Sequence, residues 1–599
     1  MLQNLKPVWD LDSIFPGGSE SKEFAAFLDK LKEQTSSLTA DLKALEAPTS
    51  LEQLKKLEAI VARFEQVRSD WMQASSFVSC LEAQNVHDGK AHFLRDRVTQ
   101  LGAANQETGT LFDQYILEVP EELWKQFLAL DSMKPIAFIL DERRQLGAAK
   151  LPTEQEILAG NLAVDGYHAW SQLYDVIVGR MHIPSEKDGK IENLSVGQAF
   201  NLLSDTDPTV RKQMFANWKQ AWSENEDLCA KALNHLSGFR LALYKERKWD
   251  DFLKEPVEIC RMSEKTLNVM WEVVEKNRER LVPYLKRKKE LLGIDSLSFY
   301  DWTAPLPGST SKMSYDEAAQ FITEQFEKFS PKMAEFATMA FEKHWIEAED
   351  RPGKRPGGFC TDLQSSKETR IFMTFDGSMS STSTLAHELG HSYHTYVMKD
   401  LPELAKDYAM NVAETASTFA ELIVKDAALK NAKSDAERIS MIDDKLGDAV
   451  SFFMDIFTRF TFEKKFYEQR KNGMLSAEEM NQLMEEAQKF AFAGALDEYF
   501  PNFWSAKLHF YISDVPFYNF PYTFGYMLSA GLFAQAQKEG ASFEEKYIDF
   551  LKDTGRMTVE DLAKAHLHVD LTQPDFWQSA VDAALANIDE FMTLTEKKA

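Results

Sequence analysis

Apolar residues recur at intervals of three and four positions along most of this chain, and that spacing restricts its fold more than any other feature of the sequence. One clear run is Leu51, Leu54, Leu57, Ile60, Val61, Phe64 and Val67. Residues spaced in this way share one face of an α-helix. Helix starts are indicated by the pairs Ser314 with Glu317, Ser476 with Glu479 and Ser542 with Glu545, and by Asp207 before Pro208. We therefore expect a mainly α-helical protein.

Residues 351–383 interrupt the helical pattern. The segment is rich in Gly, Pro, Ser and Thr and contains a short β-like run from Thr369 to Phe375. Glycine and proline favour turns, whereas β-branched and aromatic residues in a short run favour a strand. The sequence predicts a small β-sheet here, directly before the helix that carries the motif described below.

With 599 residues, the chain is longer than a single hydrophobic core usually serves. The pattern changes near residues 110 and 200. We expect an N-terminal helical domain over residues 1–110, a second helical segment of the same lobe over 111–200, and a large C-terminal domain over 201–599.

Acidic residues outnumber basic ones by 94 to 68, which gives a formal net charge of −26. A field of this sign repels nucleic acid phosphates and anionic lipids, so neither nucleic acid nor a membrane is an expected partner. The four cysteines lack the spacing of metal ligands or of a disulfide framework, and we expect reduced, mostly buried thiols. The sequence has no signal-peptide pattern and no membrane-length apolar run, which predicts a soluble cytoplasmic protein. It sets no expectation for the oligomeric state.

The strongest chemical signal is the run His387-Glu388-Leu389-Gly390-His391. Two histidines four positions apart lie on one face of a helix and can bind one metal ion. Glu388 is placed to take a proton from a metal-activated water without being a ligand itself. Gly390 leaves room for another backbone to approach closely. This spacing predicts a zinc hydrolase.

A catalytic zinc ion needs a third protein ligand. His394 follows His391 by three positions, and we expect it to support a ligand, to contact substrate or simply to pack. Glu414 and Glu421 are seven positions apart and share a face of a second helix, where burying two carboxylates is costly without a cation. One of them could bind zinc while the other supports a histidine. Their spacing leaves the order open, and it also allows two exposed glutamates.

At this point the chain resembles the M3 family of metallopeptidases, specifically the oligoendopeptidase F group. The resemblance rests on Thr384–His394, Ala413–Glu421, His509–Tyr511, Pro516–Tyr526, Gly357–Cys360 and Phe372–Gly377. It is strong over residues 350–535 and diffuse over the rest. It implies a clam-like, multi-helix metallopeptidase with zinc at the floor of a deep channel, and it makes 201–599 the catalytic domain.

The resemblance also assigns individual residues. It makes Glu414 the third zinc ligand beside His387 and His391, and it gives Glu421 a supporting role. It places His509 and a tyrosine of a C-terminal loop over the scissile carbonyl. Tyr522 fits that tyrosine best, with Tyr518 and Tyr526 as alternatives.

The expected function is that of a zinc-dependent endopeptidase, with one Zn²⁺ per chain, that hydrolyses internal bonds of short, unstructured oligopeptides. Glu388 is the expected base, and His509 and Tyr522 are expected to stabilise the oxyanion. The strand around 372–375 is expected to pair with the substrate backbone. A zinc exopeptidase would need a group for a substrate terminus, and no such motif is readable. A helical binding module without catalysis is expected to lack Glu388 or a ligand, and this chain keeps both.

Overall fold

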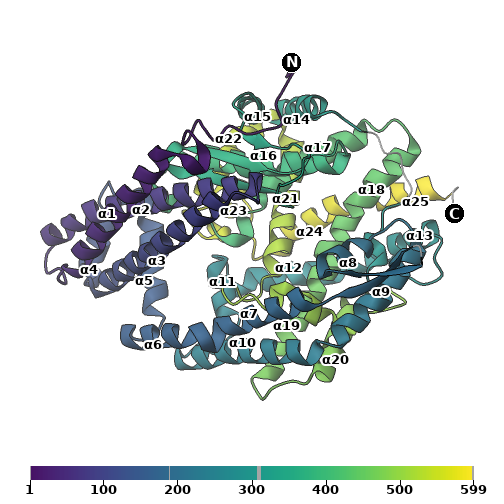
Figure 1. Cartoon of the computed structure of the whole chain (residues 1–599), viewed down its shortest axis with the longest axis horizontal. Helices are drawn as coiled ribbons and strands as arrows, with labels where there is room; N and C mark the ends of the chain where they lie inside the picture. The colour runs from purple at the N-terminus through teal and green to yellow at the C-terminus, as the bar shows by residue number, and fades with distance from the viewer. Residues whose placement is uncertain (1, 188, 307–311, 597–599) are drawn as a thin grey trace.

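The computed structural model describes residues 2–187, 189–306 and 312–596, and nearly all of its elements are helices (Figure 1). The prediction of a mainly helical protein with small sheets is confirmed. Capping boxes are present at Ser314–Glu317 and Ser476–Glu479, and Asp207 caps the helix that begins at Pro208. The predicted cap at Ser542 is wrong, because its hydroxyl donates to the Glu539 carbonyl at 2.8 Å instead.

The first part of the chain packs around its own hydrophobic core. Its helices are α1 (Lys22–Lys43), α2 (Leu51–Gln84), α3 (Gly89–Glu118), α4 (Glu121–Leu128) and α5 (Ala137–Ala148), the purple and blue group in Figure 1. The core runs from Trp9 to Leu140 and also takes in Leu363, Phe372, Leu404 and Ala405. Residues far along the chain therefore complete the N-terminal core.

A second, larger core runs from Tyr174 to Phe591. Its earlier helices are α7 (Ala169–Arg180), α8 (Val196–Leu202), α9 (Pro208–Ser223), α10 (Glu226–Glu246), α11 (Lys254–Ile259), α12 (Glu264–Asn277), α13 (Val282–Leu291), α14 (Tyr315–Phe329) and α15 (Pro331–Glu342). The later ones are α16 (Met379–Met398), α17 (Thr415–Lys430), α18 (Asp435–Val450), α19 (Ile456–Arg470), α20 (Ala477–Ala491), α21 (Phe520–Glu539), α22 (Phe543–Asp553), α23 (Val559–Leu567), α24 (Pro574–Ala584) and α25 (Ile588–Thr595).

The two cores are joined by a connector, residues 141–173. Within this described segment, Ala163 is the one buried apolar residue. The connector contains α6 (Thr153–Ala163) and a π-helix (Val164–His168) that leads into α7. Single π-turns inside helices often mark functional positions. The division of the chain at residues 110 and 200 stays a prediction.

Two small sheets accompany the helices. The strands β1 (Ile183–Lys187) and β2 (Lys190–Leu194) form an antiparallel hairpin. The second sheet has the order β3-β5-β4, from β3 (Ile346–Glu347), β5 (Glu368–Phe372) and β4 (Phe359–Leu363), and it directly precedes α16 as predicted. Phe372 pairs with Glu347 on one side and with Phe359 on the other. Phe372 itself is therefore paired on both sides, and the expectation that a substrate strand pairs around residues 372–375 stays a prediction.

The four cysteines are free; Cys80, Cys229 and Cys260 are buried, and Cys360 is partly exposed. Burial raises the pKa of the Cys80 and Cys229 thiols to about 12, so both stay protonated at neutral pH. In the described part of the chain, no helix is both long enough and apolar enough to cross a membrane.

Candidate metal centre and catalytic loop

The motif residues lie on α16, which starts directly after the small sheet. Ser378 caps this helix, and its hydroxyl accepts the Ser381 amide at 3.0 Å. The rings of His387 and His391 are 5.0 Å apart, so they project from one face as the four-residue spacing predicted. The cap and the periodicity together fix the direction of both imidazoles.

Gly390 allows the second helix to approach. A Cβ atom at this position would lie 2.4 Å from the Ala416 carbonyl oxygen and 2.6 Å from the Ser417 Cα. Only glycine fits between these backbones, as the sequence suggested. The close contact of α16 with α17 brings Glu414, the residue that precedes α17, next to the two histidines.

Three side chains converge at this contact. The Glu414 Oε2 atom lies 3.3 Å from His387 Nε2 and 3.3 Å from His391 Nε2. Two ligands that bind a tetrahedral zinc ion at about 2.0–2.2 Å lie roughly 3.3–3.6 Å from each other. Among the described residues, these three form the one cluster of His, Cys, Asp and Glu with metal-ligand spacing. Their donor set and spacing fit zinc.

Behind the cluster, a chain of charged groups holds His387. Its Nδ1 lies 3.2 Å from Glu421 Oε2, and Glu421 Oε1 lies 2.7 Å from Lys425 Nζ. Lys425 also bonds to Asp448 Oδ2 at 2.7 Å. An ionised Glu421 selects the His387 tautomer with its proton on Nδ1, which leaves Nε2 free for a metal. Sequence reasoning missed Lys425, although its position four residues after Glu421 is ordinary ion-pair spacing.

The two glutamates make the cluster a strong site for positive charge. Burial lowers the pKa of His387, but the hydrogen bonds that its ring donates to Glu414 and Glu421 outweigh burial and raise it to about 10. Burial raises the pKa of Glu421, but Lys425 and His387 lower it to about 2. Without a metal, a proton on His387 supplies the cation that these carboxylates favour.

Glu388 is buried beside the cluster, with 6% of its surface exposed. Burial raises the pKa of its carboxyl group, which suits a proton acceptor near neutral pH. Within the described residues its Oε2 atom has no hydrogen-bond partner. A Cβ atom on Gly358 would lie 3.3 Å from Glu388 Oε1, so glycine keeps the space over this carboxylate open.

His394 is turned away from the cluster and packs in the core. It is 0% exposed and stacks on Tyr408, with ring centroids 4.4 Å apart. Its Nε2 lies 2.9 Å from Thr554 Oγ1 and 3.2 Å from the Leu551 carbonyl oxygen. Because a carbonyl only accepts, this ring carries its proton on Nε2. Of the alternatives left open by the sequence, these contacts favour packing.

The C-terminal loop gathers His509, Tyr518 and Tyr522. Tyr522 OH lies 3.5 Å from His509 Nε2, and the rings of Tyr518 and Tyr522 stack at 5.2 Å. Burial, with help from Arg459 and Lys507, lowers the pKa of His509 to about 4. Burial also raises the pKa of Tyr522, and the nearby Tyr518 and Glu414 add to this effect. The His509 and Tyr522 rings therefore stay neutral and can donate hydrogen bonds.

The two other tyrosines of this region belong to the core. Tyr511 is 0% exposed and stacks on Tyr174 at 3.8 Å. Tyr526 is 4% exposed and stacks on Phe452 at 4.3 Å. Tyr526, one of the alternatives for the oxyanion, therefore packs against aromatic rings, whereas Tyr518 and Tyr522 are partly exposed.

Comparison with known families agrees with this geometry. The sequence model of peptidase family M3 matches residues 201–583, which is more than half of the chain, and that of oligopeptidase F matches residues 116–182. The chain belongs to peptidase family M3. The recognition of a metalloendopeptidase of the oligoendopeptidase F group is confirmed.

This M3 peptidase has relatives along its whole length. It is 24% identical to an oligoendopeptidase F homolog of Lactococcus lactis, over 99% of this chain and 98% of the relative. It is also 24% identical to oligopeptidase PepF of Bacillus subtilis, over 98% of this chain and 87% of the relative. Its fold is similar to a crystal structure from Chlamydophila abortus (TM-score 0.83, 20% identity, 99% of each chain). Oligoendopeptidase-F from Enterococcus faecium is similar too (TM-score 0.70, 19% identity, 96% of this chain and 99% of that one).

A cavity of about 450 Å³ in this M3 peptidase begins beside the metal centre. Its walls include Ser380 and Thr384 of α16, Glu421 and Lys425 of α17, and Asp444 and Asp448 of α18. Ser380 and Thr384 lie on the face of α16 that carries His387. The cavity therefore extends along the face of α16 that carries His387 and adjoins the charged groups that hold this histidine.

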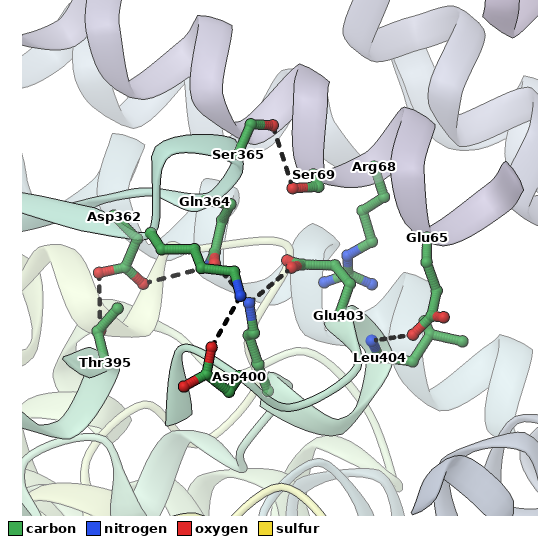
Figure 2. A network of polar contacts seen from close by, with 12 residues as sticks. Glu65, Arg68, Ser69, Asp362, Gln364, Ser365, Thr395, Asp400, Glu403 and Leu404 are labelled. Carbon is green, nitrogen blue, oxygen red and sulfur yellow. Dashed lines mark hydrogen bonds and ion pairs between the residues drawn. The ribbon is translucent and has the colours of Figure 1, made fainter. Parts of the chain in front are cut away.

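The N-terminal helix α2 is joined by a polar network to the segments that come before and after α16 in the chain (Figure 2). Bonds across the interface join Ser69 to Ser365 at 3.3 Å and Glu65 to the Leu404 amide at 2.9 Å. Beside it, Asp362 on β4 accepts the hydroxyl of Thr395 at 2.8 Å, one turn past His391 on α16. The N-terminal core thus restrains the sheet and also the helix that carries His387 and His391.

Proposed function

We propose that this chain is a zinc-dependent endopeptidase that hydrolyses internal peptide bonds of short, unstructured oligopeptides. One observation carries the proposal: two imidazole nitrogens and a carboxylate oxygen converge at the spacing of zinc ligands. The buried carboxylate of Glu388 lies beside them on the same helix.

One zinc ion is assigned to His387 Nε2, His391 Nε2 and Glu414 Oε2. A zinc ion in such a site lowers the pKa of water and polarises a carbonyl group. Glu421 orients His387 through Nδ1, and Lys425 keeps Glu421 ionised. The side chains of His387, His391 and Glu414 would hold the ion, which would supply Lewis-acid activation of water and of the substrate carbonyl.

Glu388 is the proposed base. Its raised pKa lets it accept a proton from the attacking water and later return that proton to the leaving amine. A single carboxylate can accept the proton from water and return it to the leaving amine without any movement of the helix. The buried position of Glu388 keeps competing solvent away from the transferred proton.

His509 and Tyr522 are the proposed donors to the oxyanion that forms on the substrate carbonyl. Both rings are neutral for the reasons given above, so each can donate a hydrogen bond without adding charge. Fixed donors of this kind stabilise the charge that develops in the transition state. Tyr518 lies against both rings and is assigned to shaping the pocket.

Two arguments support short, unstructured peptides as the substrates: the names of the relatives and the free energy needed to unfold a folded protein substrate. The relatives carry the names oligoendopeptidase F and oligopeptidase, which supports short peptides as substrates. A folded protein would need to unfold locally to expose an extended segment, and global unfolding costs about 5–15 kcal/mol. The acidic net charge of −26 argues against nucleic acid and anionic membranes as partners.

The test has two parts. Metal analysis of the dialysed protein should find one zinc per chain. A graded series of peptides, digested beside a folded protein and its denatured form and read by mass spectrometry, should show cleavage away from both ends of the peptides alone. Efficient cleavage of the folded protein would contradict the proposal that the substrates are unstructured peptides. Stepwise loss of terminal residues would show an exopeptidase instead.

A further inference from the structure

Two buried ionisable residues lie beneath the catalytic loop, the name used here for residues 509–522. Arg240 on α10 is 3% exposed, and Glu463 on α19 is 4% exposed. Neither has a place in the mechanism above. Burying a charge is costly unless strong hydrogen bonds compensate for the lost water. The groups that these two residues bind therefore indicate their role.

Arg240 binds the backbone of the catalytic loop shortly after His509. Its Nη2 donates to the Ile512 carbonyl at 2.6 Å and to the Ser513 carbonyl at 3.1 Å, and its Nη1 donates to Tyr467 OH at 2.8 Å. In the described part of the chain its partners are carbonyl and hydroxyl oxygens, not carboxylates. A planar guanidinium can hold two successive carbonyl groups at once.

The connector between the two cores reaches the same point of the loop. Tyr167 of the π-helix donates its hydroxyl to the Ser513 carbonyl at 2.5 Å and accepts a hydrogen bond from Arg240 Nε. The neighbouring His168 Nδ1 lies 2.7 Å from Ser513 Oγ. The connector is therefore bonded both to the loop and to the arginine that holds it.

Glu463 holds the other end of the loop. It accepts a hydrogen bond from Asn519 Nδ2 at 2.5 Å and another from the Phe517 amide. Phe517 has a φ of +54°, a backbone conformation that bulky residues rarely adopt. Strain of this kind persists only where the surroundings enforce it. The strained turn directly precedes Tyr518 and Tyr522.

We propose that Arg240 is a positioning residue for the catalytic loop. By fixing the Ile512 and Ser513 carbonyls it sets where His509 and Tyr522 stand, and Tyr167 ties that position to the connector. The inference rests on the proposed function, in which those two rings act on the substrate carbonyl. A misplacement of about 1 Å can cost roughly 10²-fold in rate, so such an anchor matters even far from the reacting bond.

The experiment compares Arg240→Lys and Tyr167→Phe with the control Tyr244→Phe in the full-length protein. Tyr244 lies one turn along α10 from Arg240, and its hydroxyl bonds to Glu255 instead of the loop. We expect kcat on an internally quenched peptide to fall about 10- to 100-fold in the first two variants, with KM changed less than about two-fold. The control should keep wild-type kcat, and bound zinc should be unchanged in all three. Tyr167→Phe removes one hydroxyl and keeps the test valid if Arg240→Lys does not fold.

A double variant separates positioning from general loss of structure. Because Arg240 acts partly through Tyr522, adding Arg240→Lys to Tyr522→Phe should lower kcat by a smaller factor than Arg240→Lys does in the wild-type chain. Losses that multiply, or wild-type kcat in Tyr167→Phe, overturn the inference. Wild-type kcat in Tyr522→Phe overturns the proposed role of that tyrosine instead, and His509→Gln then replaces it in the cycle. A native chain that binds no zinc and cuts no peptide overturns the proposed function itself.

Discussion

The metal centre and the catalytic loop act on the same substrate bond in the proposed mechanism, yet they are built in different ways. The metal centre comes from two helices that meet at Gly390, and its supporting bond from His387 to Glu421 spans 34 residues. The catalytic loop depends on Arg240, which bonds to Ser513 across 273 residues. Helix periodicity builds the first region, and long-range tertiary contacts build the second.

The two regions also handle charge differently. The metal centre concentrates carboxylates around His387 and favours a cation there. In the catalytic loop, burial keeps the His509 and Tyr522 rings neutral. The buried ionisable residues Arg240 and Glu463 lie beneath that loop and bind its backbone or side chains. One region is arranged to bind charge, and the other to donate hydrogen bonds without carrying it.

The largest expected effect is in the metal centre. Glu388→Gln keeps the shape of the side chain but removes the proposed proton acceptor, so kcat should fall by about 10²–10⁴-fold. Zinc content should stay at the wild-type level, because Glu388 is not among the three converging side chains. Steady-state kinetics with a quenched peptide and metal analysis of the same sample check both statements. A variant with near wild-type kcat would remove Glu388 from the mechanism.

The next effect is in the catalytic loop. Tyr522→Phe should lower kcat by about 10²–10³-fold, as expected for the loss of one oxyanion donor. Tyr526→Phe is the matched control, because this buried ring stacks on Phe452 and carries no proposed catalytic role. Its kcat should stay close to wild type. The reverse order of the two losses would show that the wrong tyrosine has been assigned to the oxyanion.

The difference between the regions explains what the sequence could predict. The four-residue spacing of His387 and His391 predicted that both rings share a face of α16. Glu421 lies on α17, but Glu414 directly precedes this helix, so the expectation that both glutamates share a face of one helix was only partly right. The sequence also predicted, from Gly390, that another backbone packs closely against α16. That backbone belongs to α17, and only glycine fits at this position. Helical periodicity likewise predicted the fold class.

The catalytic loop could not be resolved in this way. The three tyrosines of the loop and the nearby Tyr526 are alike in sequence, and only packing separates the buried Tyr511 and Tyr526 from Tyr518 and Tyr522. Arg240 lies in an ordinary amphipathic helix, so no local signal links it to the loop. The pairing of Phe372 on both sides also depends on β3, a two-residue strand that no sequence pattern indicated.

A third prediction tests which of the two glutamates binds zinc and which one supports His387. Glu421→Ala should weaken zinc binding by about 10- to 100-fold, which is typical for the loss of a group that orients a ligand. Glu414→Ala removes an oxygen of the cluster itself and should weaken binding further. Competition with a graded chelator measures both affinities. Equal affinities in the two variants would contradict the assignment of Glu414 as the ligand.

The smallest expected effect concerns His394, which lies three residues after His391 but packs in the core. Burial lowers the pKa of this ring to about 3, against an ordinary value of 6.5, so the folded protein keeps it neutral. Between these pH values the unfolded chain binds a proton that the folded chain does not, so the free energy of unfolding falls as pH falls, by up to about 1.4 kcal/mol per pH unit.

His394→Gln places an amide donor near the position of Nε2 but cannot take up that proton. The variant should be less stable than wild type at pH 7, because the ring stacked on Tyr408 is lost. As pH is lowered from about 6.5 towards 4.5, the difference in free energy of unfolding between the two proteins should shrink, since the acid-sensitive term is present only in wild type. Urea unfolding of the zinc-free proteins at several pH values measures this difference. Zinc affinity should be unchanged. A constant stability difference together with a loss of zinc affinity would place His394 within the metal centre after all.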